Sequence, residues 1–369
     1  MKKMTLIFLA LLTGCVSSVA FSDITPYLVD TNVGGGDGLS FSNNAVLYAK
    51  GSQSAYGKYF NPNDLSEQTY FIQGQSGWNH FSFDMQPNGA GYMVFSGKNE
   101  SLFYRYVDPS FTVGAIQYPI YQSYHNWSPV VSGDNFIWIW APGPYTNWDL
   151  KVQNLITNVS TTLAGGPGNQ GYSSNGWHDI WQDNVVYADE SGVYTKQIWT
   201  SNQATLITAE DGSSLKLWGS NGGYIYNNKI AMLGDDGKSV YMYEIGKTDK
   251  AKLVFTNDWV IDSYYYYDDL LVWSDKRNGT LDIFGLYLSD IGAVPFQVTH
   301  DATTDEKYAQ VYNGKIVWQQ SVPGAYRGNL YIAEIQRTSV PIPSTIWLLS
   351  YGLALLVRMN AVRRNPRRG

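Results

Sequence analysis

The chain has 369 residues, 44% of them hydrophobic, which is enough to bury a sizeable core, and its single cysteine leaves no internal disulfide to stabilise it. The two ends, residues 1–22 and 340–369, hold seven of the 25 Lys and Arg and none of the 31 acids, so the middle carries 18 basic against 31 acidic residues, a net charge of −13. This balance excludes a nucleic-acid partner and charge-driven binding to an anionic membrane, both of which need a basic surface.

Residues 1–22 have the pattern of a secretory signal peptide. Two lysines precede the apolar residues 4–12, and small residues follow. The sequence is compatible with two alternative cleavage sites. Ser18-Val19-Ala20 suits ordinary signal peptidase, whereas the stretch Leu-Thr-Gly-Cys ending at Cys15 resembles a bacterial lipobox, in which Cys15 would be lipidated. Both sites predict that the protein is exported.

Residues 23–339 contain a repeat of short strand-like runs. Apolar runs rich in Val, Ile, Tyr and Trp, most of them directly after Asn, Asp or Gly, start at residues 45, 91, 136, 185, 230, 270 and 316, a spacing of 40 to 49 residues. A period in the forties with four short strands per unit is typical of a propeller blade. We therefore predict an all-β fold, a seven-bladed β-propeller of four-stranded blades, with a non-repeating β-sandwich as the alternative.

The amino-terminal segment is expected to close this ring. The last unit has only three strand-like runs, the third over residues 329–335, whereas residues 24–31 form a strand-like run before the first unit. Pairing residues 24–31 with the last unit would remove an exposed sheet edge and hold the ring shut without a disulfide.

The unit that starts at Leu270 carries the clearest motif. It reads LLVWSDKRNGTLDIFGLYL, followed by Phe-Gln-Val-Thr from Phe296. This unit resembles the repeat of TolB-type, WD40-like propellers. The shared features are an apolar strand that ends in Ser-Asp, an Arg-Asn-Gly turn, an Asp-Ile-aromatic run and an outer strand. The resemblance implies the propeller fold and indicates little about activity.

Four histidines fall between the outer strand of one unit and the inner strand of the next: His80, His125, His178 and His300. Three of them have a tryptophan within two residues, namely Trp78, Trp127 and Trp177. In a propeller these connections lie on one face near the central channel, so the side chains could converge on a divalent metal. Some polysaccharide lyases of this broad propeller type use such a site. The alternative is that each histidine makes hydrogen bonds within its own blade.

Acidic turns and aromatic residues are further candidates. Asp235-Asp236, Asp268-Asp269, Asp134 and the acids at 301, 305 and 306 offer oxygen ligands for calcium, although none has the spacing of an EF-hand loop and acidic turns are ordinary in propellers. Aromatic residues make up 15% of the chain, and several lie outside the expected strand cores: Tyr118, Tyr121, Tyr124, Tyr145, Trp148, Tyr172 and Tyr264 to Tyr267. Such rings suit sugars, but blade packing is the alternative use.

The last 30 residues combine three features. Val340, Pro341, Ile342 and Pro343 precede an apolar run over residues 346–357, and five arginines follow from Arg358. The run predicts a single, short membrane helix whose arginine side faces the cytoplasm. The whole segment resembles a PEP-CTERM sorting signal, with Ile342 in place of the usual glutamate. The resemblance implies cleavage by an exosortase-type protease in a Gram-negative, exopolysaccharide-producing bacterium. The membrane association would be transient, with an inner-membrane intermediate and a final place at the cell surface or outside the cell.

The expected organisation is therefore a signal peptide over 1–22, a propeller over 23–339 and a sorting tail over 340–369. No phosphate-binding loop, nucleophile elbow or zinc-protease motif is present. We favour a non-catalytic binding protein, without a cofactor, whose partners are a polysaccharide or a surface protein, besides signal peptidase and the exosortase-type protease. The alternative is a metal-dependent, polysaccharide-degrading lyase or hydrolase that uses the histidines.

Overall fold

The computed structural model describes residues 20–21, 24–34, 39–50, 54–76, 78–86, 88–97, 101–110, 112–118, 125–141, 147–166, 170, 177–218, 224–289, 294–323, 327–335 and 337–338. Cys15, the Val-Pro-Ile-Pro motif at 340–343 and the expected membrane helix lie outside these residues. The chain divides into two units, residues 24–335 and the two ends together. In the latter, β1 (Ala20–Phe21) pairs antiparallel with β30 (Arg337–Thr338).

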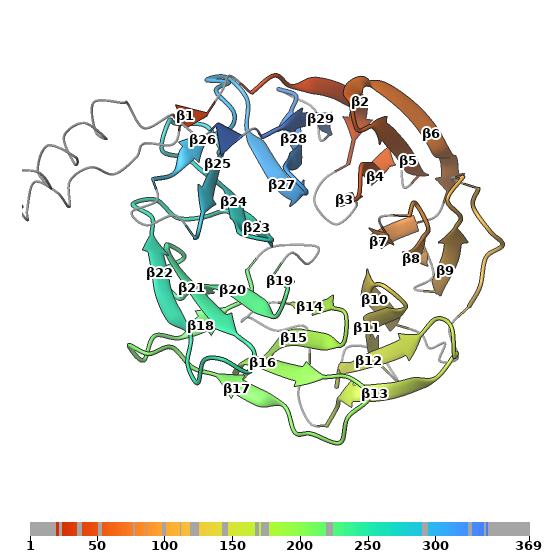
Figure 1. Ribbon diagram of the computed structural model, residues 1–369, viewed down its shortest axis with the longest axis vertical. Coiled ribbons are helices and arrows are strands. Elements are labelled where there is room, and N and C mark those ends of the chain that lie inside the picture. Colours follow the sequence, from red (N-terminus) through yellow and green to blue (C-terminus); the bar gives the residue numbers. More distant parts are fainter. Residues whose placement is uncertain are drawn as a thin grey trace, which may run out of the picture. The chain divides into compact units, whose positions relative to one another are not determined.

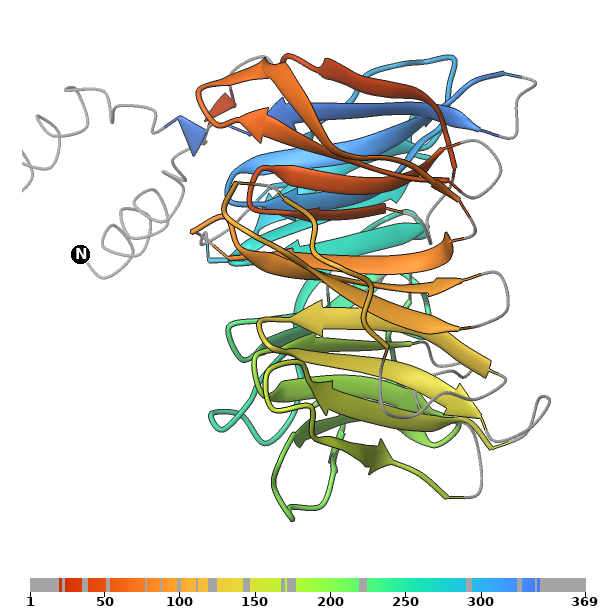
Figure 2. The same cartoon turned by 90° about the vertical axis from the view of Figure 1, so that its right-hand side faces the viewer.

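The unit of residues 24–335 is a ring of antiparallel sheets around a central axis, as Figure 1 shows face-on and Figure 2 from the side. Three sheets have four strands each, in chain order from the axis outward. They are β10 (His125–Ser132), β11 (Asn135–Ala141), β12 (Asp149–Asn154) and β13 (Ser160–Ala164); β14 (His178–Trp181), β15 (Asn184–Asp189), β16 (Gly192–Gln197) and β17 (Thr205–Ile207); and β23 (Ser263–Tyr267), β24 (Leu270–Asp275), β25 (Asp282–Tyr287) and β26 (Phe296–Gln297).

Two sheets depart from that plan. In one, β18 (Leu215–Lys216) and β19 (Ile225–Tyr226) both pair with β20 (Lys229–Gly234), and β21 (Ser239–Glu244) and β22 (Lys252–Thr256) follow. The other has three strands: β7 (Trp78–Met85), β8 (Gly91–Gly97) and β9 (Leu102–Val107). Beside β9, two isolated bridges take the place of the expected fourth strand, and Arg105 Nε donates a hydrogen bond to the carbonyl oxygen of Gly114 at 2.8 Å.

The eight-stranded sheet joins the beginning of the unit to its end. Its strands are β27 (Glu306–Tyr312), β28 (Lys315–Ser321), β29 (Gly328–Glu334), β2 (Tyr27–Val33), β3 (Leu39–Ser42), β4 (Ala45–Lys50), β5 (Ser54–Asn61) and β6 (Asp64–Ser76). Tyr27 lies opposite Ile332, and Val33 lies opposite Lys50 of β4. The first pairing confirms the prediction that the amino-terminal run adds to the last strand-like run.

The turns between the first and second strands follow from the residues that marked the repeat. Asn43 and Asn44 have φ of 40° and 62°, and Asn313 and Gly314 have φ of 47° and 74°. Asn and Gly tolerate this left-handed region, which two-residue hairpin turns require. All seven predicted apolar runs form strands, and each is preceded in its sheet by an inner strand next to the axis.

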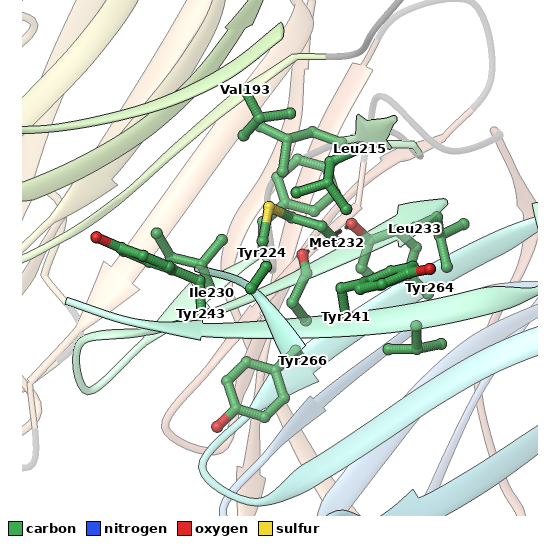
Figure 3. Packing of buried hydrophobic residues seen from close by; sticks show 14 of the residues in the cluster. Val193, Leu215, Tyr224, Ile230, Met232, Leu233, Tyr241, Tyr243, Tyr264 and Tyr266 are labelled. Carbon is green, nitrogen blue, oxygen red and sulfur yellow. Dashed lines mark hydrogen bonds between the residues drawn. The ribbon is translucent and has the colours of Figure 1, made fainter. Parts of the chain in front are cut away.

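The core lies between neighbouring sheets. Figure 3 shows one cluster in which Val193 of β16, Met232 of β20 and Tyr264 of β23 pack together. The hydroxyl of Tyr264 donates to the carbonyl oxygen of Ala231 at 3.0 Å, so its polar end is satisfied inside the core. Within the described part of the chain there is no helix with the length and hydropathy needed to cross a membrane.

Candidate binding site at the central channel

The inner strands enclose a cavity of about 70 Å³ on the axis of the ring. Its walls come from β3, β7, β10, β14, β19, β23 and β27, which follow one another around the axis, each in contact with the next. Neighbouring sheets therefore contribute side chains from the same position of each inner strand.

Four consecutive inner strands end in an aromatic residue directly before the turn. These residues are Trp181, Tyr226, Tyr267 and Tyr312, which we call the aromatic arc. Their ring centroids lie 4.1, 4.1 and 4.5 Å apart in this order, so the rings form a continuous wall on one side of the cavity. Each of the four is half-buried and keeps part of its surface accessible.

The other three inner strands carry small or charged acceptors at the equivalent position. Ser42, Asp84 and Ser132 form what we call the polar arc. Each side chain accepts a backbone N–H from the neighbouring sheet. Ser42 accepts from Met85 at 3.0 Å, Asp84 from Gly133 at 2.7 Å and Ser132 from Gln182 at 3.0 Å. The Ser42 hydroxyl also donates to Asp84 Oδ1 at 3.2 Å. These contacts fix both the spacing of the strands and the direction of the acceptors.

Two carboxyl groups, those of Asp84 and Asp179, line the cavity. Asp179 Oδ2 accepts the backbone amides of Tyr224 at 2.8 Å and Ile225 at 3.2 Å, whereas Asp84 keeps some surface open to the cavity. Burial raises the pKa of Asp84 above its usual value, against the opposing effect of the hydrogen bonds that it accepts. Burial, and then the charges of Asp179 and Asp84, raise the pKa of Tyr265 far above its usual value. Tyr265 is therefore neutral at any ordinary pH.

Two of the predicted histidines meet in a smaller cavity of about 10 Å³, which they line with Trp177. A ring nitrogen of His178, Nε2, lies 2.7 Å from the carbonyl oxygen of Ser128 on β10, so this contact joins neighbouring sheets and does not lie within the sheet of His178. His300 is exposed, does not line this cavity, and lies near Asp282 instead. The side chains of His125 and Trp127 fall outside the description. Among the described residues, no three His, Cys, Asp or Glu are arranged to hold a metal ion.

The aromatic candidates divide between core and channel. Tyr265 and Tyr267 line the cavity, whereas Tyr264 is buried in the core and Trp148 is packed with Ile139. Tyr118 is exposed, and the residues at 121, 124, 145 and 172 lie outside the described ranges. The sequence reasoning missed most of both arcs. The signal was present, because every arc residue except Asp84 directly precedes the Asn-, Asp- or Gly-containing turn that defined the repeat.

No protein-family model matches the sequence, and no curated relative matches it. Solved structures do match. An oligogalacturonate lyase from Vibrio parahaemolyticus superposes with a TM-score of 0.57 at 11% identity, over 87% of this chain and 100% of that one. An oligogalacturonate lyase in complex with manganese gives 0.54 at 12% identity, over 87% and 98%. The β-propeller domain of the Trilobed protease from Pyrococcus furiosus gives 0.55 at 9% identity, over 86% and 98%. At these identities the likeness shows the fold alone, a β-propeller of this type.

Proposed function

We propose that this chain is an exported, seven-bladed β-propeller that binds a glycan at its central channel, at the cell surface or in an extracellular matrix, without catalysing a reaction. The observation that carries the proposal is the aromatic arc facing the polar arc across one cavity. Sugar rings stack their C–H faces on aromatic rings while their hydroxyls bond to nearby polar groups. The two arcs offer both kinds of contact.

The count of seven treats the eight-stranded sheet as two blades. One blade is β27, β28, β29 and β2, and the other is β3, β4, β5 and β6. The single register pair Val33 and Lys50 joins them, whereas pairing within each blade is continuous over several residues. Seven inner strands around the axis support the same count.

A binding role fits the state of the carboxyl groups in the cavity. Asp84 and Asp179 both accept backbone hydrogen bonds from the next strand, so each serves to position its neighbour. A general acid or base needs to exchange its proton with a substrate, and such engagement opposes that exchange.

The export part of the proposal rests on the two ends of the sequence, with Cys15 or Ala20 at the first cleavage and Val340 to Pro343 marking the second. Mass spectrometry of the protein from a host that contains an exosortase-type protease tests it. We expect an amino terminus at Cys15 with lipid or at Phe21, and loss of residues 344–369. Retention of those residues would contradict the sorting claim.

The glycan part is tested by applying the full secreted protein to a glycan array and following binding by tryptophan fluorescence. We expect Trp181→Ala to lower the affinity at least about fivefold, because a stacking ring contributes about 1 kcal/mol or more. Trp218→Ala is the matched control, since Trp218 is 49% exposed and does not line the cavity. Equal loss in both variants, or no glycan bound, would contradict the proposal.

The second candidate is the metal-dependent polysaccharide-degrading enzyme. It is favoured by the meeting of His80 and His178 in one cavity and by the likeness to a lyase solved with manganese. The described residues supply no third ligand, so we derive no metal-dependent step. Elemental analysis of untagged protein tests the candidate: stoichiometric metal that is lost in the His125→Ala/His178→Ala double variant would favour the enzyme over the binder.

A further inference from the structure

We propose that the ligand at the channel carries a positively charged amino group, so that the site selects glycans with free amino sugars over neutral and acidic glycans. This inference rests on the proposed glycan-binding function and names the chemistry of the sugar. It follows from the charge of the cavity, from the place of Asp84 within it and from the aromatic arc opposite.

The cavity contains two carboxyl groups and no described basic side chain. Asp84 and Asp179 line it, and none of the described residues in its wall is Lys, Arg or His. Asp84 also acts on residues of other inner strands. Burial is the larger cause of the raised pKa of Tyr265 on β23 and of Tyr312 on β27, and the charge of Asp84 raises both pKa values further. A carboxylate field in a partly desolvated cavity favours a cation and repels an anion.

Two buried acids of this chain have a cation beside them, whereas the buried Asp282 and Glu306 have no ion pair among the described residues. Asp275 is fully buried and pairs with Arg277 at 2.6 Å, and Asp30 pairs with Lys50 at 2.5 Å. Asp84 has neither; its partners are the hydroxyl of Ser42, the side-chain amide of Gln86 and the backbone amide of Gly133. Among the described residues, Asp84 thus has no cationic partner, and an ammonium group of a ligand in the channel would supply one.

The aromatic arc adds to the preference for a cation. The negative face of an indole or phenol ring attracts an ammonium group within about 6 Å of its centroid. Trp181, Tyr226 and Tyr267 lie on strands across the axis from Asp84, so an amino sugar in the cavity would meet ring faces on one side and a carboxylate on the other. The same geometry disfavours uronic acids, whose carboxylates would approach Asp84 without a counter-charge.

The test compares three oligosaccharides of equal length by calorimetric titration into the full secreted protein: hexamers of glucosamine, N-acetylglucosamine and galacturonic acid. A lysine-containing peptide forms a fourth arm, since it carries the same ammonium chemistry on another class of molecule. We expect the glucosamine hexamer to bind at least about tenfold more tightly than the acetylated hexamer, and the galacturonate hexamer to bind most weakly.

The informative variant is Asp84→Ser. Ser42 and Ser132 make the same backbone contact at the equivalent positions, so serine keeps the acceptor and removes only the charge. We expect this variant to melt as the native protein does and to lose the preference for the glucosamine hexamer over the acetylated one. Asp235→Asn, at an exposed acid paired with Lys216 outside the cavity, is the control and should keep the preference.

The outcomes separate the two proposals. Equal binding of the three hexamers, tighter binding of the acetylated or acidic one, or an unchanged preference in Asp84→Ser overturns the amino-sugar inference and leaves glycan binding in place. Tighter binding of the lysine peptide than of any hexamer also overturns it. The absence of binding to every glycan, on the array and in titration, overturns the proposed function itself.

Discussion

The ammonium group of Lys50 lies 2.5 Å from Oδ1 of Asp30, and this ion pair bridges β4 and β2 at the point where the ring closes. Oδ2 of the same carboxyl group accepts the hydroxyl of Tyr48 at 2.6 Å and that of Tyr70 at 3.1 Å. The closing strand is therefore attached both by its backbone ladder with β29 and by one carboxylate that binds three side chains of the neighbouring strands.

Replacing this carboxylate should weaken the closure. We expect Asp30→Ala to lower the free energy of unfolding by about 3 kcal/mol, because it leaves Lys50 and the buried hydroxyl of Tyr48 without their partner. Urea denaturation at pH 7 measures the loss. The control is Glu210→Gln, whose pair with Lys252 is exposed on both sides and should contribute under about 1 kcal/mol. Equal losses in the two variants would show that the pair has no special part in closure.

The contribution of Asp30 should disappear in acid. Burial opposes its ionisation, but hydrogen bonds from Lys50 and Tyr48 outweigh that effect and hold the pKa of Asp30 below its usual value of 3.8. A lowered pKa in the folded state means that the stabilisation is complete above pH 3.8 and is lost as the pH falls through the folded value. The difference in stability between the native protein and Asp30→Asn should thus be constant from pH 5 to 7 and shrink below about pH 3.5.

Glu306 should behave in the opposite way. Burial, and then the charges of Asp282 and Asp301, raise its pKa to about 7, against the opposing hydrogen bond of Thr299. One oxygen of Glu306 and one of Asp282 are buried without a hydrogen-bond partner within the described structure. Because the folded state prefers the protonated form, ionisation destabilises the fold as the pH rises from 4.5 through 7.

We therefore expect Glu306→Gln to stabilise the protein in base and not in acid. The gain should approach about 3 kcal/mol above pH 8 and vanish below pH 4, where the glutamate is protonated in both states. Thermal unfolding across this pH range measures the gain. Glu244→Gln, at a half-exposed glutamate paired with Lys247, is the control, and it should give no gain in base. A gain that does not change with pH would contradict the assignment.

Arg277 should be among the most sensitive positions. Its guanidinium binds both oxygens of the fully buried Asp275, at 2.9 and 2.6 Å, and lies 3.7 Å from the ring centroid of Phe284. Arg277→Ala leaves that carboxylate uncompensated, so we expect a loss of about 3 to 5 kcal/mol in urea denaturation. Arg277→Lys should recover only part of the loss, because an ammonium group lacks the two-pronged geometry. Full recovery by lysine would show that charge alone matters.

Gly91 connects packing to the site. A Cβ at this position would lie 2.1 Å from the carbonyl oxygen of Asp84, which no side-chain movement relieves. We expect Gly91→Ala to displace β7 at the channel and to lower both the melting temperature and the affinity for the glycan. Gly34→Ala is the control, since a Cβ there meets its nearest neighbour at an ordinary 3.5 Å. A variant that keeps its full affinity would show that the position of β7 does not limit binding.

The sequence predicted the strands well and the site poorly, for physical reasons. Apolar runs such as 185–189 and 270–275 are buried in the middle of their sheets, so they read directly as strands. The missing outer strand also predicted closure. The sequence alone could not show which tyrosines of the run Tyr264 to Tyr267 face the channel, because neighbouring side chains of a strand point to opposite faces. Only the strand register assigns Tyr265 to the channel and Tyr264 to the core.

His300 does not line the cavity that His80 and His178 share, for a related reason. Residues at equivalent positions of the repeat need not be equally buried. The connection before β27 places His300 at the surface near Asp282. Apart from Asp84, the arc residues directly precede a turn, and hydrophobic periodicity carries no signal at this position because residues as different as Ser42, Ser132 and Tyr312 occupy it.

The pairing of β2 with β29 also sets an order of events during synthesis. The strand made first waits about 300 residues for the strand that it pairs with. A nascent chain can complete its middle sheets while its opening segment is still unattached, but it cannot finish the ring until nearly the whole polypeptide has emerged. Chains that terminate early, before β29, would therefore leave a β-strand free to recruit a neighbour, and the cell's quality control would meet them as aggregation-prone fragments.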